Sequence, residues 1–426
     1  MKKNIYSSPL IWALIFLGLI LRTGYVLTLP NEKLMPDERD YVQSAINLLN
    51  EGSFDRTVYY HVPPGVPVLF AGLFAITGPD YRAARLFQAL LFIPLGFILF
   101  SLGRELAGSA AGFLTLVGGA IYPSFIFFTG YALTETATTL AITALVLTAI
   151  QAVRLPGWRP AVLFGAILVA GALTRASIFY FVLSVPFIFI LGRGIRLRAW
   201  LKPVLVTLAV FIALYTPWVL VNRYYFGEVI LAPTIGGGVM LYQTALRLTI
   251  PDEKERSAFL KHEILPKYYY PAGAGHPERL AGDRFLTTEG KRLILENINQ
   301  YPAVIWHNIK CFWQLYPENS EDNRKARFYF IVGLGSFGLI LPLAIVGAWG
   351  IRKEFRKFAA LYGFIAYFTI LHALLYGKLR YRVPMDGLLI ALAACGVIFL
   401  LSRFRPTWQK AVERLISYPE LKENSP

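Results

Sequence analysis

The sequence predicts an all-α polytopic membrane protein, and three observations predict it. The 426 residues are 56% hydrophobic and only 16% charged, with a mean hydropathy of +0.51. Apolar runs of about 20 residues, long enough to cross a bilayer as a helix, recur along the chain. Aromatic residues make up 15% of the chain, which is typical of the Trp and Tyr belts at membrane surfaces. A water-soluble chain of this length would need far more polar surface.

The apolar runs predict about ten membrane crossings. The first run, 9–29, follows a basic N-terminus and is too long for a typical signal sequence, so we expect it to be retained. The stretch 160–192 is too long for one helix and is interrupted at Thr174-Arg175, which predicts a hairpin of two short helices. The other predicted spans are 82–103, 107–128, 133–153, 203–221, 327–350, 358–376 and 384–402.

Basic residues set the expected orientation, because short cytoplasmic loops are rich in Lys and Arg. Starting from Lys2 and Lys3, every second connection is basic, so we expect both termini in the cytoplasm of a bacterial-type inner (plasma) membrane. The net charge of +16 then reflects loops beside anionic lipid head groups, and we expect no nucleic-acid partner. The basic loops carry Arg104, Arg154, Arg159, Arg193, Arg196, Arg198, Lys202, Arg352, Lys353, Arg356, Lys357, Arg403 and Arg405.

Two segments on the outer, periplasmic side are long. Residues 30–81 contain a short apolar run at 66–77 that suits an interfacial or re-entrant helix. Residues 222–325 contain amphipathic stretches that suit juxtamembrane helices. We therefore expect three parts: an N-terminal transmembrane module 1–221 that includes the first outer loop, the outer segment 222–325, and C-terminal transmembrane helices with a short cytoplasmic tail at 326–426.

Two adjacent carboxylates, Asp37 and Glu38, follow the first span. A carboxylate within hydrogen-bond reach of a hydroxyl can take its proton, so this pair is the candidate for acid–base chemistry. Pro36-Asp37-Glu38 is also a good helix start, and a solvated N-terminal cap is the alternative. The spacing of these residues does not separate the two interpretations.

A basic cluster precedes the last span, on the side where short loops are normally poor in Lys and Arg. Cations at the mouth of a span suit a lipid-linked phosphate or diphosphate. Anchoring of snorkelling side chains in head groups is the alternative. We favour phosphate binding by this cluster, which consists of Lys378, Arg380, Tyr381 and Arg382.

Other ionisable residues stand near the outer ends of spans, where a charge without a partner is costly. Structural ion pairing is at least as expected for them as substrate contact, with Glu135 a natural partner for one of the arginines. They are Arg22, Arg82, Arg85, Glu135 and Arg175.

The remaining polar residues point to no second chemistry. His61, beside Pro63-Pro64, is a candidate for substrate contact. We expect no required cofactor, and the sequence leaves a divalent metal open. The other clusters lack the spacing of metal sites, phosphate loops or disulfide frameworks: His262, Glu263, His276, Glu278, Gly236–Gly238, Cys311 and Cys395.

Taken together, these residues resemble the polytopic glycosyltransferases of the GT-C fold. The likeness is to glycosyltransferase family 39, the bacterial dolichyl-phosphate-mannose-protein mannosyltransferase homologues and aminoarabinose transferases. It runs over most of the chain, in short motifs that share one order and one predicted side of the membrane. The motifs are Asp37-Glu38 with Tyr41 and Ala45, Pro63–Pro67, Arg85-Leu86, Leu133–Glu135, Leu173–Arg175, Gly237–Tyr242 and Arg380–Pro384.

The resemblance implies an enzyme, a hexosyl- or pentosyltransferase that uses a polyprenyl-phosphate-linked sugar. The acceptor would be a hydroxyl of a glycan, lipid or protein on the outer face, and Asp37 would be the base of an inverting displacement. Cations would stabilise the charge that develops on the leaving phosphate: Lys378, Arg380 and Arg382, beside Tyr381. Residues that would orient the base or bind sugar and acceptor are Glu38, Glu135, His61, Arg82, Arg85 and Arg175.

Alternatives stay open at this point. Aminoarabinose transferases tend to have Lys just before the Pro-Pro pair, whereas this chain has Val62, which weakens a lipid A role. By the resemblance, mannosyl-phosphate enzymes need no metal and diphosphate-using oligosaccharyltransferases do, and Asp37-Glu38 does not separate the two cases. A GT-C ligase or polymerase that acts on diphosphate-linked oligosaccharides is a further alternative. A transporter or flippase of lipid-linked sugars would place charges near the membrane midplane in repeated halves. A non-catalytic scaffold of polymer assembly would tolerate loss of Asp37.

Overall fold

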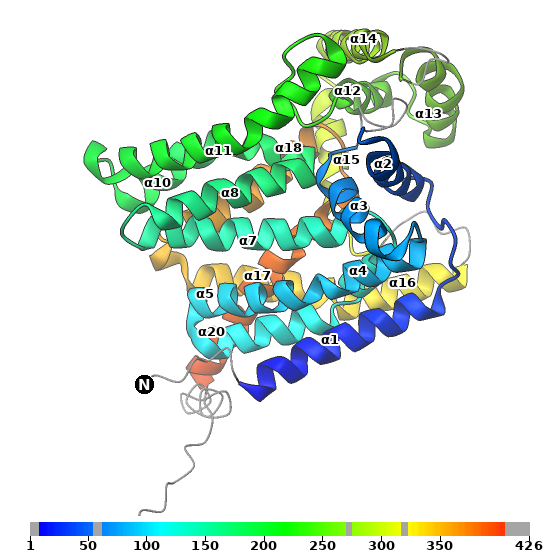
Figure 1. The fold of residues 1–426 in the computed structure, drawn as a ribbon. Helices are drawn as coiled ribbons and strands as arrows, with labels where there is room; N and C mark the ends of the chain where they lie inside the picture. Colours follow the sequence, from blue (N-terminus) through cyan, green and yellow to red (C-terminus); the bar gives the residue numbers. More distant parts are fainter. Residues whose placement is uncertain (1–7, 54–61, 270–274, 317–322, 405–426) are drawn as a thin grey trace, which may run out of the picture.

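The computed structural model describes residues 8–53, 62–269, 275–316 and 323–404, and these ranges contain helices and no strands. Long helices lie side by side in a bundle, and shorter helices gather at its right-hand end (Figure 1). The predicted all-α membrane fold is therefore confirmed. The helices of the bundle are α1 Pro9–Thr28, α5 Phe92–Ile121, α7 Glu135–Arg154, α8 Arg159–Thr174, α10 Val185–Arg193, α11 Leu197–Phe226, α16 Asn323–Gly335, α17 Phe337–Gly350, α18 Ala359–Leu374 and α20 Asp386–Phe404.

Seven helical stretches in the described ranges are long and apolar enough to cross a membrane. One of them folds back on itself, because α5 loses helical geometry at Ala107 and Gly108. Its two halves pack so closely that a Cβ on Gly103 would lie 2.2 Å from Thr115 Oγ1. Counted as two passes, and with the shorter apolar helices α8 and α18, these ranges give the expected ten crossings.

The predicted hairpin at 160–192 is also present. Helix α8 ends at Thr174, and Arg175 is extended, with φ −148° and ψ 122°. The chain then returns through the short helix α9 (Ala176–Phe179), the 3-10 turn η2 (Tyr180–Ser184) and α10. The break at Thr174-Arg175 therefore places the Arg175 side chain at the end of the bundle.

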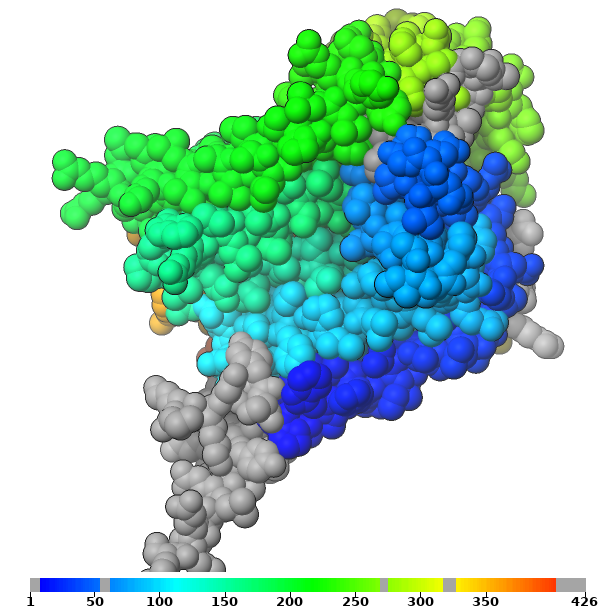
Figure 2. All heavy atoms as spheres, viewed as in Figure 1, coloured from blue at the N-terminus to red at the C-terminus, as the bar shows by residue number. Residues whose placement is uncertain are grey.

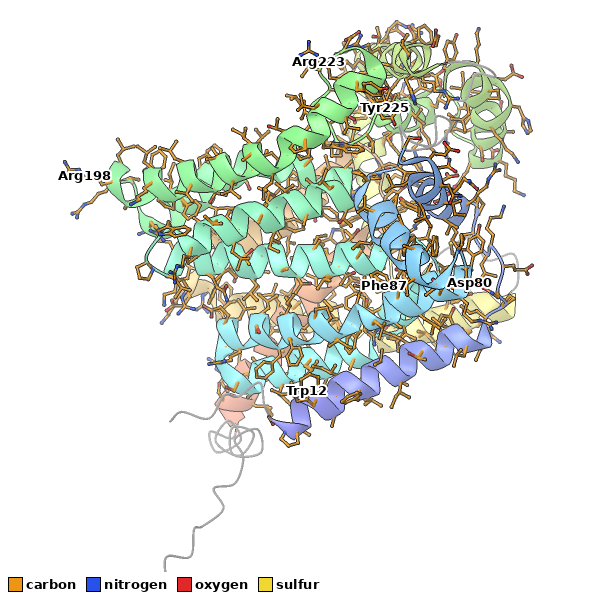
Figure 3. All side chains as sticks on the ribbon, viewed as in Figure 1. Trp12, Asp80, Phe87, Arg198, Arg223 and Tyr225 are labelled. Carbon is orange, nitrogen blue, oxygen red and sulfur yellow. The ribbon has the colours of Figure 1, made fainter. Side chains whose placement is uncertain are left out.

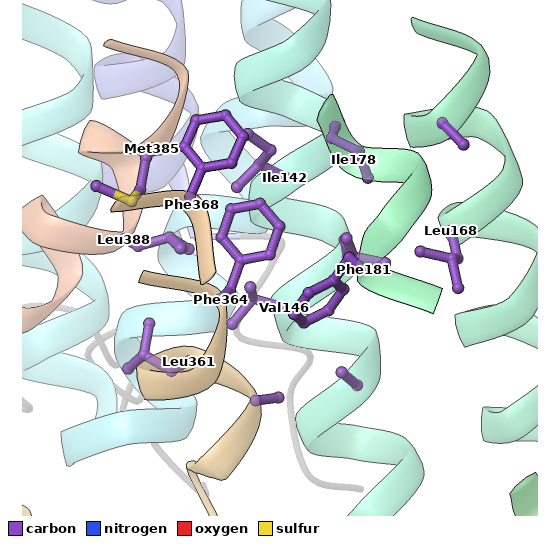
Figure 4. Close-up of a cluster of buried hydrophobic side chains, with 14 of the residues drawn as sticks. Ile142, Val146, Leu168, Ile178, Phe181, Leu361, Phe364, Phe368, Met385 and Leu388 are labelled. Carbon is purple, nitrogen blue, oxygen red and sulfur yellow. The ribbon is translucent and has the colours of Figure 1, made fainter. Parts of the chain in front are cut away.

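Helix α7 forms the centre of the bundle, since most of its residues are buried. Figure 4 shows Ile142 and Val146 of α7 packed among Phe181, Phe364 and Phe368 from η2 and α18. Lipid tails are as apolar as these side chains, so close packing rather than water exclusion must hold such helices together. Small residues also allow helices α17 and α20 to pack closely. A Cβ on Gly347 of α17 would lie only 1.8 Å from the Leu392 carbonyl oxygen of α20.

A second group of helices forms a layer over one end of the bundle (Figures 1 and 2). Helix α3 is the predicted short apolar run, and at 13 residues it packs against α2. Helix α11 leads from Arg198 at the opposite end to Arg223 and Tyr225 beside this layer, and Asp80 also lies at this end (Figure 3). The layer comprises α2 Glu38–Glu51, α3 Gly65–Thr77, α4 Tyr81–Leu90, α12 Gly237–Ala245, η3 Leu246–Leu248, α13 Glu253–Phe259, η4 Leu260–Tyr269, α14 His276–Glu296 and α15 Tyr301–Trp313.

Candidate functional site

Asp37 lies at the start of α2, yet its side chain makes no capping hydrogen bond. Its Oδ2 instead accepts a hydrogen bond from Arg380 Nη1 at 2.8 Å. Of the carboxylate's two oxygens, only Oδ2 has a hydrogen-bond partner within the described ranges, and the side chain is 54% exposed. The solvated-cap interpretation therefore does not describe this carboxylate, which points toward a cation from the far end of the chain.

Arg380 joins three distant parts of the sequence. It lies on the short helix α19 (Leu379–Arg382), and its Nε donates to Glu135 Oε1 while its Nη1 holds Asp37. Glu135 begins α7 and is 1% exposed, and Arg175 Nη1 lies 3.9 Å from the same oxygen. The structure thus brings together four residues that the sequence singled out, Asp37, Glu135, Arg175 and Arg380, as one mixed-charge cluster.

Tyr41 stands one turn after Asp37 on α2 and lies among these charges. Burial raises the pKa of its phenol, and the neighbouring Glu135 carboxylate raises it further. A tyrosine whose pKa is raised stays protonated and can donate a hydrogen bond. It is therefore a further polar group at the cluster.

Glu38 differs from the expectation that it takes part in the chemistry. Its side chain is wholly buried and pairs with Arg85 at 2.9 Å. Its Oε2 accepts from the backbone N–H groups of Leu34 and Met35, and its Oε1 also accepts from Ala132 N. With both oxygens engaged, Glu38 has no free position for a substrate, and it fixes the loop that carries Asp37.

Arg85 is the matching half of this internal pair and is 1% exposed. Besides Glu38, it donates to the carbonyl oxygens of Pro30 and Glu32 at 2.8 and 2.7 Å. Arg85 is therefore a structural clamp between α4 and the loop after α1. Substrate contact, one of the two roles expected for Arg85, is not available to this buried side chain.

Arg382 also departs from the expected phosphate contact. Its side chain is 1% exposed and its Nε pairs with Asp386 at 3.1 Å. Its Nη1 donates to the Gln314 carbonyl at 2.7 Å, and its guanidinium lies 3.3 Å from the centre of the Phe337 ring. Tyr122 donates to the other oxygen of Asp386 at 2.7 Å. This buried network ties α15 to α20 and leaves Arg382 no access to a ligand.

Tyr381 is part of a stack of flat groups beside the cluster. The Arg175 guanidinium lies 5.0 Å from the centre of its ring, and the His372 ring stacks on it at 5.2 Å and 24°. Phe312 stacks on the other face of His372. The stack orients Arg175, whose Nη1 also lies 3.5 Å from Thr134 Oγ1.

A second group of cations surrounds Tyr376, which precedes Lys378. Lys378 Nζ and the Arg247 guanidinium lie 4.9 and 5.9 Å from its ring centre, and Gln243 donates to its hydroxyl at 3.1 Å. Burial acts to lower the pKa of Lys378, but the Tyr376 hydroxyl raises it on balance. The Arg247 Nε is buried without a hydrogen-bond partner in the described ranges. We call Arg247, Tyr376 and Lys378 the Tyr376 group.

Further cations lie near the Tyr376 group. Burial lowers the pKa of the neighbouring His307, and so do the charges of Arg247, Lys310 and Arg256. An unpaired guanidinium donor beside further cations is a suitable place for an anion such as a phosphate. The Tyr376 group and Arg380 are close along the chain, and Tyr381 lies 6.2 Å from Tyr376, ring centre to ring centre.

A cavity of about 10 Å³ lies beneath Glu135 and is also lined by Arg22 and Thr136. The Glu135 Oε2 and Thr136 Oγ1 atoms are buried without hydrogen-bond partners in the described ranges. Arg22 donates to the Gly119 and Ala120 carbonyls at 2.8 and 3.0 Å. The volume and the polar lining suit one bridging water, which would connect the buried end of Glu135 to Arg22.

Two further residues that the sequence predicts for the site are Arg82 and His61. Arg82 is partly exposed, and its side chain makes one long contact, 3.5 Å to the Leu29 carbonyl. His61 lies outside the described residues.

The described residues contain no group of three His, Cys, Asp or Glu side chains placed to hold a metal ion. Asp37 and Glu135 converge, but they converge on the guanidinium of Arg380. A divalent cation between these carboxylates would have to displace that arginine. The arrangement therefore does not fit a metal centre built on Asp37 and Glu135.

Sequence reasoning missed several residues of this end of the bundle. Asp386 could have been found, since it lies four residues after Arg382 and that spacing pairs side chains on a helix. Arg247 and Tyr376 carry no local signal, because they meet only through the packing of the outer layer on α18. His372 gave no signal either, as a lone His on an apolar helix is usually a core residue.

Comparison with known proteins assigns the fold. Residues 61–220, from α3 to most of α11, match the family model described as dolichyl-phosphate-mannose-protein mannosyltransferase. No curated protein matches the chain by sequence. The apo oligosaccharyltransferase of Archaeoglobus fulgidus superposes with a TM-score of 0.60 at 15% identity, over 97% of this chain and 52% of that one.

The same archaeal enzyme, AglB, in complex with an inhibitory peptide and a dolichol-phosphate gives a TM-score of 0.57 at 14% identity, over 96% of this chain and 52% of that one. ArnT from Cupriavidus metallidurans bound to undecaprenyl phosphate gives a TM-score of 0.45 at 12% identity, over 94% and 80% of the two chains. The chain thus spans about half the length of AglB. The resemblance seen in the sequence is confirmed: this is a multi-pass membrane protein with the GT-C glycosyltransferase fold.

Proposed function

We propose that this chain is a glycosyltransferase that moves a sugar from a polyprenyl-phosphate-linked donor to an acceptor hydroxyl. The observation that carries the proposal is the pairing of Asp37 with Arg380. A half-exposed carboxylate, held by one oxygen and open at the other, has the geometry of a positioned general base. AglB has the same fold and was solved with a dolichol-phosphate, which supports a lipid phosphate as the donor's leaving group.

The reaction is an inverting single displacement. Asp37 takes the proton of the acceptor hydroxyl as the hydroxyl oxygen attacks the anomeric carbon from the face opposite the phosphate. The bond between that carbon and the phosphate oxygen breaks, and its electron pair leaves with the lipid phosphate. The products are the glycosylated acceptor, a protonated Asp37 and the lipid phosphate, and Asp37 then returns its proton to solvent.

The cations of the site have two different roles in this reaction. Arg380 is engaged by two carboxylates, so its role is to orient Asp37 rather than to hold the phosphate. The Tyr376 group offers the free donor, Arg247 Nε, together with Lys378. These two cations stabilise the negative charge that develops on the leaving phosphate, and preorganised charges of this kind are usually the largest single contribution to catalysis.

The site lies at an end of a membrane bundle, where a lipid-linked donor can reach it from the bilayer and a polar acceptor from water. We place this end on the outer, periplasmic face, as the basic loops predict. The reaction needs no metal in this scheme, because Arg247 and Lys378 supply the positive charge that meets the leaving phosphate. Full activity in excess EDTA is the expected result for the purified enzyme.

The deciding experiment is transfer from a panel of polyprenyl-phosphate sugars by purified enzyme in lipid vesicles. Asp37→Asn is compared with Glu51→Gln, which removes an exposed carboxylate at the other end of α2. Loss of transfer in Asp37→Asn alone supports the base. Equal transfer by wild type and Asp37→Asn would exclude Asp37 as the base, and transport without transfer would assign the chain to the transporter class.

A further inference from the structure

A groove of about 690 Å³ opens between α17 and α20, at the end of the bundle away from Asp37. In Figure 1 the C-terminal end of α20 lies at the lower left, whereas α2 and α3 lie at the right. The groove's volume falls in the range of small-molecule binding sites. Nothing in the glycosyl transfer proposed above uses this end of the molecule.

Helix packing explains why the groove forms here. The two helices touch at small residues, where a Cβ on Gly396 would lie 2.1 Å from the Leu343 carbonyl oxygen. At Gly350 the contact is already with a ring, since a Cβ there would lie 3.0 Å from Phe399. Helix α17 ends at Gly350 while α20 continues to Phe404, so α20 forms one wall of the groove, and the end of α17 with the turn after it forms the other.

The groove has an apolar body and a basic mouth. Its body includes Ile345 and Trp349, which are 64% and 62% exposed, and Leu400. Its mouth carries three cations, Arg352, Lys353 and Arg403, and among the described residues no carboxylate lines it. Glu354, which follows Lys353, is paired with Lys357. The three cations are therefore not neutralised by an acidic partner in the lining.

Two of these cations are held in place by aromatic rings. The Arg352 guanidinium lies 4.0 Å from the centre of the Trp349 ring, and its Nη1 donates to the Trp349 carbonyl at 2.7 Å. The Arg403 guanidinium lies 5.8 Å from the centre of the Phe399 ring. A guanidinium stacked on a ring keeps its edge N–H groups free for phosphate oxygens. The stacking is thus compatible with ligand binding at the mouth.

We propose that this groove binds one phospholipid with an anionic head group. Its phosphate and head-group charge meet Arg352, Lys353 and Arg403, and an acyl chain lies along Ile345 and Leu400. The charge pattern identifies the occupant: a fatty chain alone would leave three cations unmatched, and a soluble anion would leave Ile345 and Trp349 exposed. Basic pockets between membrane helices on the cytoplasmic side bind anionic lipid head groups in this way.

The test compares two triple variants that remove the same charge from the same end of the bundle. The groove variant is Arg352→Gln/Lys353→Gln/Arg403→Gln. The control variant is Arg196→Gln/Arg198→Gln/Lys202→Gln, which changes exposed cations around the start of α11, and Arg198 lies at that end of the bundle in Figure 3. Each full-length protein is purified from vesicles of four parts phosphatidylcholine to one part phosphatidylglycerol, and native mass spectrometry counts the retained lipids.

Wild type and the control variant should retain one phosphatidylglycerol per chain, and the groove variant should retain it about tenfold less, since each cation near a lipid surface adds to the attraction. Equal retention by the two triple variants overturns the proposal, and so does retention of phosphatidylcholine as readily as phosphatidylglycerol. Ile345→Trp keeps every charge and fills the groove. This variant should also lose the lipid, and it decides the matter if the groove triple variant does not fold.

Discussion

Asp37 and Glu38 are neighbours in the chain, and each meets an arginine at nearly the same distance, 2.8 and 2.9 Å. Their surroundings are opposite. Glu38 has no exposure and both of its oxygens are engaged, whereas Asp37 is 54% exposed and bonded through one oxygen. The Glu38–Arg85 pair stabilises the fold, whereas the Asp37–Arg380 pair leaves one carboxylate oxygen of Asp37 free to accept a hydrogen bond from a substrate.

The physical reason for the difference is desolvation. A carboxylate taken out of water is stable only if its partner and further hydrogen bonds replace the lost solvation. Glu38 receives these from Arg85 and from three backbone N–H groups. Asp37 keeps part of its water, so it needs no such shell and remains accessible. The surroundings of the two residues therefore decide which one acts in transfer and which one stabilises the fold. Substitution of Asp37 should lower activity, and substitution of Glu38 should lower stability.

The largest expected effect is that of Asp37→Asn on transfer. Amide nitrogen cannot accept the hydroxyl proton, and loss of a general base costs about 10²–10⁴-fold in rate. Since this side chain is exposed, the thermal unfolding midpoint of the variant should stay close to that of wild type. Steady-state transfer measures the expected loss of rate, and a thermal shift assay on the same preparation measures the unfolding midpoint. A large fall in the unfolding midpoint would contradict the division between the two carboxylates.

Glu38→Gln should do the reverse and act mainly on stability. Its amide N–H₂ would face donors such as Leu34 N or Ala132 N, and Arg85 would lose its counter-charge. Removing one partner of a buried pair costs about 3–5 kcal/mol. Chemical denaturation of the vesicle-embedded or detergent-solubilised protein measures this cost.

The double variant Glu38→Gln/Arg85→Met supplies the matched control. Without the arginine charge, the buried glutamine is less costly. The double variant should therefore lose less unfolding free energy than the two single variants lose together. If the changes in the free energy of unfolding of the two single variants simply add up in the double variant, Glu38 and Arg85 do not stabilise each other. Arg85 would then not act as a structural clamp through Glu38.

The convergence of Asp37, Glu135, Arg175 and Arg380 was predictable from the sequence in one respect only. Alternating basic loops placed all four on one side of the membrane, and span lengths gave the bundle that brings that side together. The hairpin break at Thr174-Arg175 was visible for the same reason. These features depend on hydrophobicity and charge along the chain, which a single sequence displays directly.

The roles within the cluster were not predictable. Glu38 is distinguished from Asp37 by the N–H of Ala132, a residue 94 positions away. Arg382 is distinguished from Arg380 by the carbonyl of Gln314, a residue 68 positions away. Such partners come from the folding of remote segments against each other, so the inward or outward direction of a charged side chain has no local signature.

A smaller effect is expected for Arg247→Gln. If Arg247 Nε meets the donor phosphate in both the bound and the reacting states, its loss weakens donor binding more than the chemical step. One hydrogen bond to a charged group contributes about 1.5–3 kcal/mol, which corresponds to a rise in donor KM of roughly ten- to a hundredfold. Kinetics at varied donor concentration separate KM from kcat. An unchanged donor KM would remove Arg247 from the phosphate site.

The smallest effect should come from Arg82→Gln, and it sharpens the comparison because Arg82 and Arg85 share one face of α4. From the sequence we expect the same role, ion pairing or substrate contact, for both arginines. Arg85 is enclosed by Glu38 and two carbonyls, whereas the Arg82 side chain has one contact at 3.5 Å. A contact this long and partly exposed contributes about 0.5 kcal/mol or less. Arg82→Gln should therefore leave transfer within about twofold of wild type, while Arg85→Gln loses stability. A fall in transfer without a fall in stability for Arg82→Gln would instead bring Arg82 into the site, and helix α4 would then contribute a substrate contact in addition to Asp37.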